Sequence, residues 1–137
     1  MTFRTLALSL TLSLTIAASA QLCSAQASSD ARFEAALKRV DPSERLEQLC
    51  DYAAVKQIGR DKNPYRPDRA VIESLAPAHI EGDTARGNGG AFRSKGQWYQ
   101  FSFVCKTSPD RLKILSFDYK IGERIPEDKW DHYGLWR

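Results

Sequence analysis

The sequence has little from which to build a catalytic or metal centre. It contains two histidines, His79 and His132, and neither has a ligand partner at the spacing of known metal sites. The serines lack both the Gly-x-Ser-x-Gly elbow and the Ser-x-x-Lys pair of serine nucleophiles. The glycine-rich run Gly82–Gly90 lacks the lysine of a phosphate loop. We therefore predict no metal and no cofactor, and the balance favours a protein that is not an enzyme.

Strong charge and long apolar runs are also missing. Lys and Arg number 20 against 17 Asp and Glu, so the net charge of +3 is too mild to indicate nucleic acid as a partner. The uncharged run Leu6–Ala18 is shorter than the ~20 residues that a transmembrane helix needs. Arg4 precedes this run and small residues follow it, which is typical of a secretory leader.

This leader sets the expected domain organisation. We interpret residues 1–25 as a signal peptide and residues 26–137 as a single domain, with cleavage after Ala25 or Ala27. Either cleavage would remove Cys23. The mature protein is then expected to be periplasmic or secreted, with no transmembrane span after signal cleavage.

The cysteines agree with export. After the expected cleavage Cys50 and Cys105 remain, and two cysteines in an oxidising compartment most simply pair. Such a bridge would stabilise the fold by roughly 4 kcal/mol in the chain-entropy account. Cleavage after Ala20 would instead leave Cys23 as an odd thiol, and the even count favours the later sites.

Helical signals dominate the first part of the expected domain. Ser28-Ser29-Asp30 offers a helix cap, and apolar residues recur at helical spacing up to Val40. Asp41-Pro42-Ser43-Glu44 is a stronger start signal, because Asp41 can cap and Pro42 suits the first turn. The helix that follows should end at Gly59. It carries one apolar stripe: Leu46, Leu49, Cys50, Ala53, Ala54 and Ile58.

Strand signals dominate the second part. Asn88-Gly89 and Lys95-Gly96 are each interpreted as a two-residue hairpin turn. Residues 97–106 alternate, so that one face carries the aromatic side chains and the other does not. The expected core face has Tyr99, Phe101, Phe103 and Cys105, and the opposite face has Trp98, Gln100, Ser102 and Val104.

A second strand and a short helix complete the expected elements. Leu115, Phe117, Tyr119 and Ile121 should share one face of a strand within residues 112–121. Pro126 opens a short C-terminal helix in which Trp130, Tyr133 and Trp136 are spaced by three. Residues 70–80 fit either a strand or a helix.

Together these elements predict an α+β fold. N-terminal helices pack on an antiparallel β-meander, a short helix ends the chain, and one disulfide joins Cys50 to Cys105.

One surface is the candidate for binding. Its residues come from two basic segments. One of these segments holds a tryptophan on the face of its strand that is opposite the core. The residues are Arg93, Lys95, Trp98, Lys62 and Arg66. If the ring of Trp98 is half-exposed, flanking cations suit an anionic, ring-bearing partner. The commoner alternatives are a solvated loop and a tryptophan that packs the second side of the sheet.

Several strings resemble a known bacterial family. They are Arg45–Asp51, Pro67–Arg69, Gly90–Tyr99, Phe103–Cys105 and Ile121–Pro126 with Trp130. The family that they resemble is catalogued as domain of unknown function 930, and the resemblance covers about residues 40–137. It implies a secreted or membrane-tethered protein with no assigned activity and no catalytic residues.

The sequence as a whole favours an exported cell-envelope protein that acts as a non-catalytic binding or interaction module. Its expected partner is an anionic envelope component or a protein, and not nucleic acid. The alternative is a small periplasmic hydrolase, or an enzyme inhibitor, whose site carries no recognisable motif.

Overall fold

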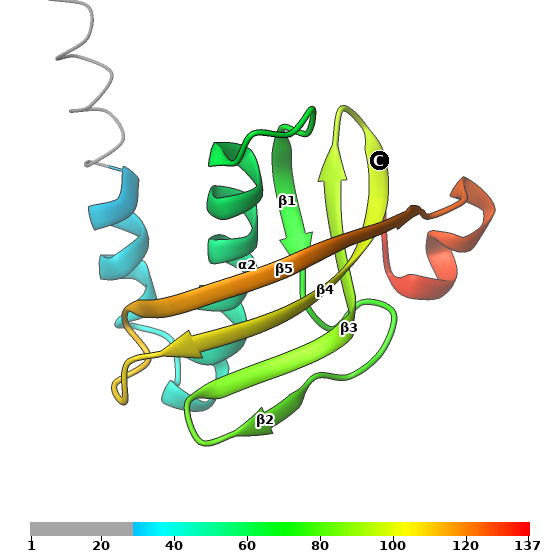
Figure 1. Ribbon diagram of the computed structural model, residues 1–137. Coiled ribbons are helices and arrows are strands. Elements are labelled where there is room, and N and C mark those ends of the chain that lie inside the picture. The colour runs from blue at the N-terminus through cyan, green and yellow to red at the C-terminus, as the bar shows by residue number, and fades with distance from the viewer. Residues whose placement is uncertain (1–28) are drawn as a thin grey trace, which may run out of the picture. The chain divides into compact units, whose positions relative to one another are not determined.

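The structure is a computed structural model that describes residues 29–137 (Figure 1). The expected leader, its cleavage sites and Cys23 lie outside the described residues, so they stay predictions. The chain divides into two compact units, Met1–Ala35 and Ala36–Arg137. Residues 29–37 are helical, as the capping signal predicts. Everything that follows concerns the second unit.

Helix α2 (Pro42–Arg60) begins where its capping signal predicts. The carboxylate of Asp41 accepts a hydrogen bond from the backbone N–H of Ser43 at 2.9 Å, and Pro42 occupies the first turn. The helix ends one residue after Gly59. The residues that it buries are the predicted apolar stripe: Leu46, Leu49, Cys50, Ala53, Ala54 and Ile58.

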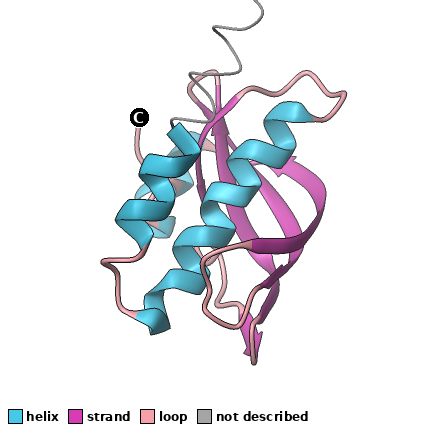
Figure 2. Ribbon diagram, turned by 90° about the vertical axis from the view of Figure 1, so that its left-hand side faces the viewer, coloured by secondary structure: helices cyan, strands magenta, loops and turns pink. Residues whose placement is uncertain are grey.

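Five antiparallel strands form one sheet. They are β1 (Pro67–Val71), β2 (His79–Glu81), β3 (Thr84–Ser94), β4 (Gln97–Thr107) and β5 (Ile114–Arg124). The order across the sheet is β1-β3-β4-β5, and β2 also pairs with β3. The last three strands are the predicted meander. Figure 2 shows the longer of the two helices, α2, lying along one face of this sheet, which confirms the α+β class.

Strands β1 and β2 follow one another along the same edge of β3. β2 pairs with residues 84–86 and β1 with residues 91–94. Between them, residues 72–78 leave the ladder and run as turns and irregular chain. The segment 70–80, for which the sequence allows a strand or a helix, is therefore two strand ends separated by a turn.

The prediction of a hairpin at Asn88-Gly89 is wrong, because these residues lie inside β3. The β4 partners of Gly87 and Gly90 are only two residues apart, so β3 contains a bulge with one extra residue at this point. A Cβ atom on Gly89 would lie 2.3 Å from the backbone nitrogen of Ala76. Glycine is required here by a close approach of segment 72–78.

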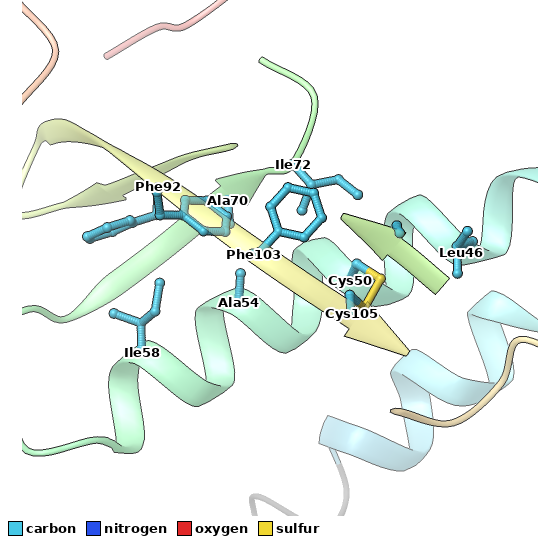
Figure 3. Packing of buried hydrophobic residues seen from close by; sticks show 11 residues of the cluster. Leu46, Cys50, Ala54, Ile58, Ala70, Ile72, Phe92, Phe103 and Cys105 are labelled. Atoms are coloured by element: carbon cyan, nitrogen blue, oxygen red, sulfur yellow. A yellow bond between two sulfur atoms is a disulfide. The ribbon is translucent and has the colours of Figure 1, made fainter. Parts of the chain in front are cut away.

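The face of the sheet that meets α2, here called the inner face, carries the larger core (Figure 3). Phe101 and Phe103 are buried there as predicted, and Phe117 is partly buried against them. The sulfur atoms of Cys50 on α2 and Cys105 on β4 are 1.97 Å apart, in a disulfide with a Cα–Cα distance of 6.0 Å. The predicted pairing of helix and aromatic strand is thus confirmed.

Strand β5 departs from its predicted alternation at Leu115. Phe117, Tyr119 and Ile121 pack on the inner core, but Leu115 is 59% exposed and Ile114 takes the inner position. A register shift at this point, next to Thr107 of β4, inserts one residue and reverses the alternation before Ser116.

The opposite face, here called the outer face, holds a second core. The C-terminal segment covers it and contains two 3₁₀ turns, η1 (Glu127–Lys129) and η2 (Asp131–Tyr133), where the sequence predicts a short helix. In Figure 1 this segment (red) lies across the sheet from α2. The buried residues of the second core are Ala91, Trp98, Ile125, Trp130 and Leu135.

Candidate functional site

The two basic segments of the predicted binding surface lie side by side at one end of the sheet. Loop 61–66 leads from α2 into β1, and the backbone N–H of Arg66 donates to the hydroxyl of Ser94 at 2.9 Å. Ser94 is the last residue of β3, directly before the turn that holds Lys95. The fold therefore joins residues that are nearly thirty positions apart in the sequence.

The turn between β3 and β4 is the predicted hairpin at Lys95-Gly96. Ser94 pairs with Gln97, and both turn residues have positive φ, 52° for Lys95 and 74° for Gly96. This is the backbone that a two-residue turn with the twist of the strands requires. Lys95 is exposed at its tip.

The expectation that Trp98 has a half-exposed ring is wrong. Its exposed fraction is 0%, and its indole N–H donates to the backbone carbonyl of Trp136 at 2.8 Å. The alternative interpretation, in which Trp98 packs the second side of the sheet, describes what is found. The physical reason is that the C-terminal segment folds back over the outer face, which strand alternation alone does not reveal.

The exposed tryptophan at this end of the sheet is Trp136. Its exposed fraction is 45%, its ring lies 5.8 Å from that of Trp98, and the guanidinium of Arg69 stands 4.9 Å from its ring centroid. An Arg over an indole face at this distance is a cation–π contact. Trp136 is expected in a short C-terminal helix from its spacing, and its role as a surface group was not predicted.

Arg93 is held by an acid. Its guanidinium donates two hydrogen bonds to the carboxylate of Asp68, at 3.0 and 2.8 Å, and lies 6.0 Å from the ring centroid of Trp98. These hydrogen bonds hold the pKa of Asp68 below its usual value. A register shift in β1 makes this reach possible, because Asp68 and Arg69 together face Arg93.

The two remaining basic residues differ in how they are held. The side chain of Arg66 donates to the backbone carbonyls of Asn63 and Tyr65. Lys62 is exposed, and among residues 29–137 its side chain forms no hydrogen bond or ion pair with the hairpin residues 93–98. We call the assembled surface the basic–aromatic patch. It consists of Arg66, Arg69, Arg93, Lys95 and Trp136.

A second group of polar residues lies where α2 meets the start of segment 72–78. The carboxylate of Asp51 accepts a hydrogen bond from the backbone N–H of Ile72 at 2.7 Å. Burial, and to a smaller degree the charges of Glu47 and Glu73, raise the pKa of Asp51 to about 7. Glu73 in turn accepts from the backbone N–H of Ala78 at 2.9 Å. Two of these acids thus hold the irregular segment in place.

The described part of the chain contains no group of three or more His, Cys, Asp or Glu placed to hold a metal. Both histidines are exposed, and the ring of His132 packs against that of Tyr133. No helix within residues 29–137 combines the length and apolar character needed to cross a membrane.

These observations define a small α+β domain with one disulfide, two cores and a basic–aromatic patch at one end of its sheet. A family model described as Domain of Unknown Function (DUF930) matches residues 37–135, so the chain belongs to this family. This confirms the resemblance found in the sequence. No curated protein and no solved structure gives a significant match.

Proposed function

We propose that this chain is an exported cell-envelope protein, periplasmic or secreted, whose domain is a non-catalytic binding module for an anionic partner. The basic–aromatic patch is the binding surface. The observation that carries this proposal is the exposed ring of Trp136, stacked with Arg69 at 4.9 Å and held by the hydrogen bond from buried Trp98. An aromatic ring fixed on a rigid support loses little conformational freedom when a ligand packs on it.

Charge sets the class of partner. Arg66, Arg69 and Lys95 are exposed, whereas the ion pair with Asp68 neutralises Arg93. Exposed cations beside a ring suit a partner that carries both negative charge and flat or ring-shaped groups, such as an anionic glycan of the envelope. Contacts of this kind are individually weak and screened by salt, so binding should weaken as ionic strength rises.

Export is supported by the Cys50–Cys105 pair, since structural disulfides persist in oxidising compartments. N-terminal mass measurement on protein recovered from the cell envelope tests it. We expect a start near Gln26 or Ser28. An intact Met1, or a start at Gln21, would contradict the proposed cleavage.

The binding proposal is tested by pull-down of the mature protein from envelope extract at low and moderate salt. The variant Lys95→Glu with Trp136→Ala removes a cation and the half-exposed ring, which also packs against buried Trp98. We expect it to lose the partner that the wild type retains. The matched control is Lys106→Glu with Leu115→Ala, which makes the same kinds of change at exposed positions of β4 and β5.

If the patch variant retains the same partners as the wild type at both salt concentrations, the patch is not the binding surface. Both variants must first show the wild-type far-UV circular dichroism and a cooperative unfolding transition. The control variant is expected to bind as the wild type does, and its failure would indicate that binding depends on overall charge instead.

The alternative, a small hydrolase, is favoured by one observation. A carboxylate with a pKa of about 7, as in Asp51, is in the range of a general base at neutral pH. The hydrolase would be supported if the wild type changes the captured component chemically and the variant Asp51→Asn does not. Capture without chemical change supports the binding module.

A further inference from the structure

The sheet has one long edge without a strand partner among the described residues. β5 runs for 11 residues, from Ile114 to Arg124, and pairs with β4 alone. Such an edge presents a row of backbone N–H and C=O groups to any chain that can align with it. Natural sheets usually interrupt or charge their edges, so the side chains of β5 decide what this edge can accept.

Two opposite charges stand on the outer face of β5, two residues apart. Asp118 and Lys120 are exposed, and their cross-strand neighbours on β4 are the uncharged Val104 and Ser102. Within the described part of the chain neither Asp118 nor Lys120 has an ion-pair partner. The strand therefore carries one positive and one negative charge on the same face, both of them exposed.

The segment around these charges is regular. Register shifts lie at each end of β5, one between Ile114 and Ser116 and the other between Ile121 and Arg124. Residues 116–121 between them keep strict alternation with β4. A straight stretch of this kind can accept one more strand in register.

We propose that β5 is a self-association surface, on which a second copy of this chain pairs antiparallel about a two-fold axis at Tyr119. In this arrangement Asp118 lies opposite Lys120 of the second copy, and the two-fold axis repeats the pair. On the inner face, Phe117 lies opposite Ile121 of the second copy, an aromatic side chain beside a β-branched one. The two sheets become one continuous sheet.

Charge selects this register. A two-fold axis at residue 118 would place Asp118 opposite its own copy, and an axis at residue 120 would do the same for Lys120. Like charges directly opposite one another destabilise a strand pair, whereas opposite charges stabilise it. The pattern Asp-Tyr-Lys is therefore complementary to itself in the Tyr119-centred register and repulsive in the registers on either side.

The test is sedimentation equilibrium of the mature protein over a range of concentrations up to about 0.5 mM, where even a weak dimer is populated. We expect a monomer–dimer equilibrium. Lys120→Asp and Asp118→Lys should each raise the dissociation constant by about tenfold or more, because each places like charges opposite one another. The double exchange Asp118→Lys with Lys120→Asp restores both pairs and should return the dissociation constant to near the wild-type value.

The control is Lys106→Asp, the same charge reversal on the outer face of β4, away from the free edge. It should leave the dissociation constant unchanged. Hydrogen exchange should also show extra protection of residues 116–121 at high protein concentration. The proposal is overturned if the protein remains monomeric at all concentrations. It is also overturned if neither single reversal changes the dissociation constant, or if the double exchange fails to restore pairing.

Discussion

The two faces of the sheet are closed by different means. A regular helix of 19 residues, tied by the disulfide, covers the inner face with its apolar stripe. An irregular C-terminal segment with two short 3₁₀ turns covers part of the outer face, using Trp130 and Leu135 against Trp98. The difference teaches that burial of a strand's second face can depend on a segment with almost no regular structure.

The sharpest test of this comparison is whether the outer face is a true core. Trp98→Ala and Phe103→Ala should each lower the free energy of unfolding by about 3–5 kcal/mol, because each removes a large buried ring. Urea unfolding followed by circular dichroism measures both. The control Leu115→Ala, at a side chain that is 59% exposed, should cost under about 1 kcal/mol. A cost for Trp98→Ala as small as for the control would mean that only the inner face is a core.

The disulfide distinguishes the inner face from the outer one. Cys105→Ala should lower the free energy of unfolding by about 2–5 kcal/mol, as for other small disulfide-bonded domains. Reduction of the wild type should produce a loss of similar size. Peptide mapping without reductant should recover Cys50 linked to Cys105. Free alkylation of both thiols in the native, unreduced protein would contradict the structure of the inner core.

The stability that the inner face provides should also depend on pH, through the titration of Asp51. Its native pKa of about 7 lies above the ordinary 3.8, so between these values the native state keeps a proton that the unfolded chain has lost. The contribution of Asp51 to stability therefore falls as pH rises through this window, by at most about 4 kcal/mol.

The variant Asp51→Asn keeps an oxygen acceptor for the N–H of Ile72 but does not titrate. Its stability relative to the wild type should increase between pH 4 and pH 8 by up to about 4 kcal/mol. Urea unfolding at several pH values measures this difference. Glu123→Gln, an exposed acid at the end of β5, is the control and should show no such trend. A pH-independent difference for Asp51→Asn would show that Asp51 does not titrate as described.

The smallest effect tests the register that separates the two faces. Gln100 is only half-buried on the outer face, and its side chain donates an exposed hydrogen bond to the carbonyl of Asn88 at 2.9 Å. Gln100→Ala should therefore change the free energy of unfolding by less than about 0.5 kcal/mol. A cost comparable to that of Phe103→Ala would mean that β4 is shifted by one residue, which exchanges its faces.

The inner face could be predicted from sequence because both of its components are periodic. The cap at Asp41, the stripe from Leu46 to Ile58 and the alternation through Phe101 and Phe103 each give a local signal. The helix and the strand each place a cysteine on their apolar side, so a disulfide between the two cysteines could be predicted. The helix, the disulfide and the aromatic core were accessible from the sequence for this reason.

Two errors in the prediction arise where an extra residue interrupts the period of a strand. Asn88-Gly89 has the composition of a hairpin turn, but the approach of Ala76 uses the glycine for close packing inside a strand. Leu115 is moved outward by an inserted residue.

The prediction of the candidate site was wrong at one residue, Trp98, because a segment distant in the sequence covers its ring. Nothing in strand β4 indicates that Trp98 is covered, because its cover comes from residues 125–136, which carry no regular period. The position of Lys95 at the tip of a hairpin could be predicted, because the turn at Lys95-Gly96 is a local signal. The ring that completes the patch, Trp136, depends on tertiary structure alone.

Residues 72–78 determine whether strand pairing between copies is finite or open-ended. A sheet with two straight edges can add a neighbour on each side and grow into a fibre. Here the edge formed by β1 and β2 is broken by this segment, which the N–H of Leu75 ties to the carbonyl of Gly89 at 2.8 Å. Pairing through β5 then uses the one long edge that remains. The assembly therefore closes at two copies, because segment 72–78 leaves no second long edge for a further copy.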